Sequence, residues 1–461
     1  MSAATMTYAA HARAILSLGL PLVGGHLAQF AIGLTDTVMI GWYGVEELAA
    51  LTIAAMYFFT LFLFGSGFAW AVMPMVAAFA AQQDEVLIRR ATRMALWWSI
   101  LYSALVLPIL WFSGPILLWL GQTEAVAGLS QAYLRVAGWG MLPALWVMVL
   151  KNYLAGLEHT RVVLWITLVA ALANAAANYV LVFGHFGAPE LGIIGAALAS
   201  LLVQIVSIIL VVLYALRKLP EHQLFVRFWK PDAEMFRRVF ALGLPIGLTT
   251  LAEVALFAGS SVMMGWLGTI PLAAHGIAIQ ISTATFMVQL GLSNAATVRA
   301  GTALGRRDAD HLLRGARVVV ALGGAGVAVS ILAFLAVPDL LMTGFLDPED
   351  PARAAILQAG RGFLAMAALF QLVDAAQVLH LGLLRGLQDT RVPMLMAALS
   401  YWGVGMPAAW VFGFPLGWGG MGVWFGLALG LAVAAALMMA RFWRHGAAMV
   451  PGDAAGSRRA A

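Results

Sequence analysis

The sequence predicts an all-α membrane protein that crosses the bilayer many times, and three observations lead to this class. Of its 461 residues, 62% are hydrophobic and only 10% are charged, and the mean hydropathy of +0.92 exceeds that of ordinary soluble domains. The apolar residues form long runs, and a helix needs about 20 such residues to cross a bilayer. The period-two alternation of a transmembrane β-barrel is absent from these runs.

Charged residues and clusters of proline or glycine divide the apolar part of the chain into twelve runs. Each run is expected to form one transmembrane helix. The first is too long for the apolar core of a signal peptide, so we expect it to remain as the first span. The spans are predicted near residues 14–40, 47–80, 92–112, 130–150, 162–184, 191–214, 238–265, 271–300, 315–337, 359–382, 393–414 and 419–442.

The distribution of basic residues predicts the orientation. Of the 26 Lys and Arg residues, 23 lie in the terminal segments or in gaps that follow even-numbered spans, and Arg135, Arg353 and Arg361 lie on the other side. Because basic loops stay in the cytoplasm, both termini are predicted to be cytoplasmic. Scattered short basic loops indicate anionic lipid and no nucleic-acid partner. The lack of cysteine excludes disulfides and thiolate chemistry.

Two stretches of the first half recur in the second half. Residues 18–50 and 242–274 are identical at 15 of 33 positions, and the segment 156–162 reappears as 386–392. Six spans are an even number, so both halves enter the membrane from the same face, as parallel repeats. Two such bundles around a central cavity are suited to alternating access. The predicted division is 1–214 for the first lobe, 215–237 for a cytoplasmic linker, 238–445 for the second lobe and 446–461 for a disordered cytoplasmic tail.

Three acidic residues fall inside the apolar runs: Asp36, Glu253 and Asp374. Carboxylates are costly in hydrocarbon, so those within spans normally face a polar interior and mark an ion or proton pathway. No Lys or Arg is expected at a comparable depth. The three acids therefore predict an acceptor for a proton, a hard monovalent cation or a cationic substrate.

Amide side chains accompany these acids. Asn174 and Asn178 are four residues apart on one helical face, and with Asp36 they could form an oxygen-lined Na⁺ site. In the second half, Glu253 and Asp374 could hold Na⁺ or a proton. The candidates for lining a substrate cavity there are Gln280, Asn294, Phe370, Gln371 and Gln377. Taken singly, each amide is more often a hydrogen bond between packed helices.

The signatures of soluble enzymes are missing from the sequence. It contains no GxxxxGK[ST] for nucleotide, no HExxH for zinc and no GxSxG nucleophile elbow. We therefore expect a protein that is not an enzyme and holds no cofactor. Energy for transport would come from an ion gradient through the buried acids.

At these residues the chain resembles the multidrug and toxic compound extrusion (MATE) transporters, in their bacterial NorM-like branch. The resemblance lies in the string 28–41 around Asp36, in Glu253, and in the stretch 370–390 around Asp374. It implies a V-shaped bundle of two lobes that exports cationic or amphipathic drugs in exchange for Na⁺ or H⁺. It also implies a C-lobe cation site at Glu253 and Asp374, and an N-lobe site at Asp36, Asn174 and Asn178. Phe370 replaces a Tyr of some relatives and so removes a hydroxyl ligand.

Other functions remain open from the sequence. A flippase for lipid-linked oligosaccharide precursors, from the same superfamily, would need Arg or Lys in its cavity to hold phosphate, whereas the buried charge here is negative. An ion channel would leave the repeated halves unexplained. The leading hypothesis is a monomeric antiporter for small lipophilic cations.

Overall fold

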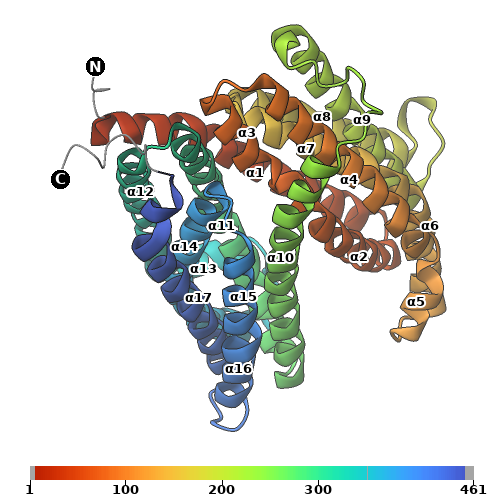
Figure 1. Ribbon diagram of the computed structural model, residues 1–461. Helices are drawn as coiled ribbons and strands as arrows, with labels where there is room; N and C mark the ends of the chain where they lie inside the picture. Colours follow the sequence, from red (N-terminus) through yellow and green to blue (C-terminus); the bar gives the residue numbers. More distant parts are fainter. Residues whose placement is uncertain (1–5, 350, 452–461) are drawn as a thin grey trace. The chain divides into compact units, whose positions relative to one another are not determined.

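The computed structural model describes residues 6–349 and 351–451, which form α-helices joined by short loops (Figure 1). Within these residues, twelve spans are long and apolar enough to cross a membrane, in the order that the hydropathy predicts. Three of these spans combine neighbouring helices: 46–81, 124–156 and 391–413. The all-α class and the twelve spans are thus confirmed.

The helices gather into two contact units whose boundaries differ from the predicted division of the chain. The first contact unit is 24–247, and the second is 1–23 together with 248–461. The predicted linker 215–237 therefore packs inside the first contact unit, and the start of the predicted first lobe packs inside the second. The two long helices α1 (Tyr8–Tyr43) and α10 (Ala233–Leu267) each contribute to both units.

A proline marks each point at which a helix passes from one unit to the other. Pro21 in α1 and Pro245 in α10 lie two residues before the unit boundaries. A proline inside a helix removes one backbone hydrogen bond and bends the helix. The two prolines occupy equivalent positions of the sequence repeat, so both halves carry the same break.

The first contact unit holds the second part of α1, the first part of α10 and the elements between them. These are α2 (Val45–Trp70), α3 (Val72–Ala81), α4 (Glu85–Trp111), α5 (Ser113–Trp119), α6 (Glu124–Ala137), η1 (Gly138–Gly140), α7 (Met141–Gly156), α8 (Thr160–Phe183), η2 (His185–Gly187), α9 (Gly192–Lys218) and η3 (Pro220–His222). Aromatic side chains hold the start of α10 against α4. The Trp98 ring stacks on Phe236 at 4.1 Å between centroids, and its indole N–H donates to the Phe236 carbonyl oxygen at 2.9 Å.

The second contact unit holds the remaining helices. These are α11 (Thr269–Arg306), α12 (Ala309–Ala336), α13 (Pro338–Thr343), α14 (Arg353–Gly386), α15 (Arg391–Ala398), the π-helical η4 (Leu399–Gly405), α16 (Met406–Gly413) and α17 (Gly419–Met449). Helices α11, α14 and α17 pack side by side (Figure 1). Because α17 ends at Met449, residues 446–449 are helical, which corrects the predicted tail, and 452–461 lie outside the described residues.

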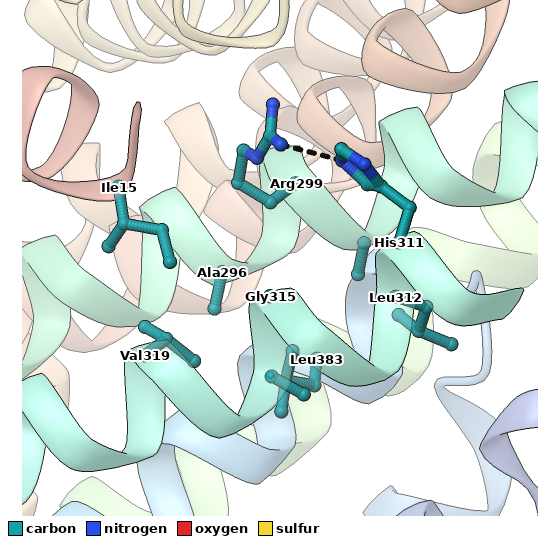
Figure 2. A pocket seen from close by; sticks show the side chains of 10 residues that line it. Ile15, Ala296, Arg299, His311, Leu312, Gly315, Val319 and Leu383 are labelled. Atoms are coloured by element: carbon teal, nitrogen blue, oxygen red, sulfur yellow. Dashed lines mark hydrogen bonds between the residues drawn. The ribbon is translucent and has the colours of Figure 1, made fainter. Parts of the chain in front are cut away.

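The first turns of α1 are fixed within the second contact unit. Ile15 faces a small cavity, of about 10 Å³, between α11, α12 and α14, and Figure 2 shows Arg299 donating to the His311 ring at its edge. The donor and acceptor nitrogens are 2.6 Å apart, and the His11 ring lies 4.7 Å from that of His311. Apolar and polar contacts together hold this end of α1.

Candidate functional site

Asp36 and the two asparagines of α8 come together in the first contact unit. Asn178 donates from its side-chain nitrogen to the Asp36 carboxylate at 2.5 Å and contacts the Asn174 side-chain oxygen at 3.3 Å. Both asparagines are fully buried, whereas Asp36 is half-buried. The spacing of four residues on one helix places both amides beside the carboxylate, as the helical periodicity predicts.

This first cluster also includes a tyrosine that the sequence did not single out. Tyr133 of α6 is buried and lies close enough to interact electrostatically with Asp36. The buried side-chain oxygen of Asn178 has no hydrogen-bond partner among residues 6–349 and 351–451. A carboxylate, an amide oxygen and a phenol together offer oxygen ligands of the kind that hard cations prefer.

Glu253 and Asp374 form a second cluster, inside the second contact unit. They come from α10 and α14 and interact electrostatically with each other. Asp374 is 2% exposed, and its Oδ1 has no hydrogen-bond partner within the described chain. Gln377, one helical turn beyond Asp374, is also fully buried. Two carboxylates so placed favour a bound proton or cation, because like charges in a buried site repel each other.

A π-helical turn brings a tyrosine to the second cluster. Tyr401 of η4 is fully buried and interacts electrostatically with Glu253 and Asp374. The next residue, Trp402, donates from its indole nitrogen to the Ala252 carbonyl oxygen at 3.2 Å, and so ties η4 to the turn that carries Glu253. Such turns commonly occur at functional positions in helices. In the sequence, the one indication that Tyr401 lies beside these acids is the presence of a polar hydroxyl in an apolar span.

Arg385 corrects the expectation that no cation lies near the buried acids. It is 8% exposed, belongs to α14 and interacts electrostatically with Glu253 and Tyr401. Arg385 lies beyond the predicted span 359–382, whereas α14 continues to Gly386 and so carries Arg385 on the same helix as Asp374. The second cluster therefore combines two carboxylates with one guanidinium, and its charge is less negative than predicted.

The other predicted cavity residues lie in different surroundings. Gln280 is exposed on α11, and Asn294 is buried on the same helix. The Gln371 side-chain nitrogen donates to the Ser282 carbonyl oxygen at 2.9 Å and to the Thr285 hydroxyl at 2.6 Å, which is a hydrogen bond between packed helices.

Phe370 lies in a buried aromatic group of the second contact unit. Its ring is 5.8 Å from Phe257 and 5.8 Å from Trp424, with edge-to-face geometry at both. Phe370 thus packs between α10 and α17. Its ring carries no hydroxyl, so it serves as a packing residue and not as an ion ligand.

The donor set suits a monovalent cation or a proton better than a transition metal. Within residues 6–349 and 351–451, no group of three or more His, Cys, Asp and Glu side chains could hold a metal ion. Each cluster offers instead one or two carboxylates with amide and phenol oxygens. Such oxygen ligands are typical of hard cations.

Fold and clusters together define a polytopic helical membrane protein with two repeated halves, each with at least one acidic residue inside its spans. The sequence pattern of the MatE family matches residues 21–180 and 245–411, so the match begins twice, 224 residues apart. The chain belongs to the MatE family, as its motifs indicated. The double match agrees with the repeat found in the sequence.

Named relatives and solved structures agree with this assignment. The chain is 48% identical over 437 residues to the "Probable multidrug resistance protein NorM" of Rhizobium meliloti (strain 1021), covering 94% of this chain and 93% of the relative. It is 45% identical over 434 residues to the protein of the same name from Agrobacterium fabrum (strain C58 / ATCC 33970), covering 94% and 93%. A solved "Outward-facing conformation of a multidrug resistance MATE family transporter of the MOP superfamily" matches with a TM-score of 0.86 at 18% identity, covering 96% of this chain and 97% of that chain. This last likeness concerns the fold alone.

Proposed function

We propose that this protein is a secondary active multidrug efflux antiporter of the bacterial inner membrane, with both termini in the cytoplasm. It exports lipophilic cations in exchange for inward Na⁺ or H⁺. The relatives named as multidrug resistance proteins support efflux. The observation that carries the coupling is the burial of Asp374 beside Glu253. A buried carboxylate whose Oδ1 finds no hydrogen-bond partner in the described part of the chain favours a proton or a cation.

The exchange follows from competition for negative charge. A bound ion neutralises a carboxylate and weakens the attraction for a cationic drug, so the drug leaves on the outer side. On the cytoplasmic side the drug replaces the ion, and the pathway opens alternately to the two sides. Aromatic and methionine side chains supply adaptable contacts, and a cation–π contact contributes about 0.5–2 kcal/mol.

Two clusters could bind the coupling ion. The second cluster, at Glu253, Asp374 and Tyr401, combines two acids, and its Asp374 and Tyr401 are buried whereas Asp36 is half-buried. We assign the coupling ion to it. The first cluster, Asp36 with Asn174 and Asn178, would bind a second cation or respond to the substrate.

Ethidium transport in proteoliposomes tests this function and names the ion. The purified protein should move ethidium when a Na⁺ or a pH gradient is imposed, and collapse of that gradient should stop the movement. Asp374→Asn and Glu253→Gln should abolish transport, whereas Asp310→Asn and Glu46→Gln remove exposed acids and should leave it intact. Normal transport by both cluster variants would refute the proposal. Movement of lipid-linked sugar without ethidium would identify a flippase instead.

A further inference from the structure

A broad groove of about 710 Å³ lies in the first contact unit, between the start of α4 and the segment 219–232 that joins α9 to α10. Side chains of α4 hold this segment in place through hydrogen bonds. The Trp97 indole N–H donates to the Phe228 carbonyl oxygen at 2.9 Å, and Arg93 donates to the Val226 carbonyl oxygen at 2.6 Å. The groove is therefore a formed feature of the fold and not a gap beside a free loop.

The groove lies beside the starts of two spans, and the segment that borders it begins where a third span ends. Helix α9 ends at Lys218, α10 begins at Ala233 and α4 begins at Glu85. All three positions are ends of segments that are long and apolar enough to cross the membrane. The groove consequently lies at the depth where the polar headgroups of lipids begin.

The charge of the groove is positive. Five cationic residues line it (Arg89, Arg90, Arg93, Arg227 and Lys230), against two acidic ones (Asp232 and Glu234). Arg90 already engages both acids, at 2.5 Å and 2.8 Å. Among the residues that the structure describes, Arg89 donates only to the neutral Gln223 amide, at 3.1 Å, and Arg227 and Lys230 are exposed. Arg89, Arg227 and Lys230 are thus available to an anion.

Exposed apolar side chains border these cations. Val86 and Val226 line the groove and are 52% and 53% exposed, and Trp229, between Arg227 and Lys230, is 77% exposed. Tryptophan is enriched at the boundary between headgroups and acyl chains. A ligand that satisfies both parts of this surface must be negatively charged at one end and apolar at the other.

We propose that the groove binds the phosphate headgroup of an anionic phospholipid, whose acyl chains lie against Val86, Val226 and Trp229. Basic pockets between transmembrane helices are suited to such headgroups. A cationic drug would be repelled from this groove, and a free phosphate would leave the apolar border without a partner. The bound lipid would hold segment 219–232 against α4, and this inference does not depend on the transport function.

Lipid titration of the purified, delipidated full-length protein tests the proposal. Phosphatidylglycerol is added to the protein in a neutral detergent, and the Tm is measured against a parallel titration with phosphatidylcholine. Phosphatidylglycerol should raise the Tm of the wild type at much lower concentration than phosphatidylcholine. The variant Arg227→Gln/Lys230→Gln removes two exposed cations that make no side-chain hydrogen bond or ion pair within the described chain, so it should fold.

A matched variant separates the groove from general surface charge. Arg217→Gln/Lys218→Gln removes the same charge from exposed positions at the end of α9, outside the groove. The groove variant should require roughly tenfold more phosphatidylglycerol for half of the Tm rise, and the α9 variant should behave as the wild type. Equal responses of the two variants, or equal effects of the two lipids on the wild type, would overturn the proposal.

Two further measurements distinguish the source of the phosphate and guard against misfolding. Inorganic phosphate or glycerol phosphate at millimolar concentration should neither raise the Tm nor displace phosphatidylglycerol, and displacement would show that a free anion is the ligand. Native mass spectrometry should find phosphatidylglycerol retained by the wild type and by the α9 variant. Should the double variant unfold, the single variant Lys230→Gln should show reduced retention, and unchanged retention would count against the groove.

Discussion

The side-chain nitrogen of Asn178 lies 2.5 Å from the Asp36 carboxylate and so joins α8 to the second part of α1. One carboxylate oxygen is thereby oriented by an amide donor, and the Asn178 oxygen, without a partner in the described chain, points to a ligand role. The pair acts as one unit if it binds a cation. Residues that act as a unit give non-additive losses when they are replaced together.

The first prediction is that Asn178→Ala and Asp36→Asn impair the same step. Each should reduce ethidium efflux from cells, and the double variant should be no worse than Asp36→Asn alone. Efflux rates normalised to membrane expression provide the measurement. Asn152→Ala, at another buried asparagine of the same contact unit, serves as the control and should leave efflux near the wild-type rate. If the fractional losses of efflux in the two single variants multiplied in the double variant, the two residues would act independently, which would contradict the prediction.

The second prediction concerns the hydroxyl of Tyr401. Tyr401→Phe keeps the ring in its buried place but removes an oxygen beside Glu253 and Asp374. We expect the apparent affinity for the coupling ion to fall by roughly tenfold, the loss of about 1.4 kcal/mol of binding free energy. Transport is measured in proteoliposomes at varied ion concentration.

A second buried tyrosine provides the control for this change. Tyr153→Phe removes a hydroxyl that pairs with the His222 ring at 2.5 Å, far from either acid in sequence. It should lower the Tm and leave the ion dependence unchanged. An unaltered ion dependence of Tyr401→Phe would remove Tyr401 from the site.

Much of the fold was predictable from the sequence because hydropathy alone determines which segments can cross a bilayer. The repeat was also visible, since the string at Leu18–Pro21 recurs at Leu242–Pro245. The sequence did not predict that the start of α1 packs with the second contact unit and the start of α10 with the first. This arrangement depends on which helices those two ends contact in the folded protein. Chain order carries no information about that choice.

The candidate site was predictable only in part. Buried acids are conspicuous in apolar spans, but their neighbours come from other helices. Arg385 lies about 16 Å of helix rise from Asp374, which suggested a separate position, yet it interacts with Glu253 of α10. The repeat did not help, since Ser260 occupies the place in the second half that Asp36 has in the first. The two halves share a fold and differ in their polar groups.

The third prediction tests the close packing of α10 against α2. A Cβ on Gly67 would lie 2.3 Å from the Gly243 carbonyl oxygen, so the two backbones touch. Gly67→Ala should therefore force the helices apart and lower the Tm, at a cost of about 1–3 kcal/mol in the free energy of unfolding. Gly128→Ala, at an exposed helical glycine with no atom within 4 Å of the new Cβ, should not lower the Tm. Equal Tm values for both variants would contradict the packing.

The fourth prediction is a pH dependence of stability at Asp232, in the segment before α10. Its carboxylate accepts two hydrogen bonds from Arg90, at 2.5 Å and 3.1 Å, and this partner lowers the pKa of Asp232 below its ordinary value of 3.8. A carboxyl group with a lowered pKa stabilises the folded state when it is ionised. The contribution is therefore complete above the pKa of the unfolded chain and is lost as the pH falls through the lower pKa of the folded protein.

Asp232→Asn should accordingly lower the Tm at pH 7, and its difference from the wild type should shrink as the pH falls below about 4. Thermal unfolding in detergent across pH 3–7 measures both curves. Glu234→Gln removes the other partner of Arg90. The Glu234 side chain is 84% exposed, so this change should alter the Tm little at any pH because solvent screens exposed ion pairs. A Tm difference for Asp232→Asn that stayed constant with pH would show that the lost contact is not ionic.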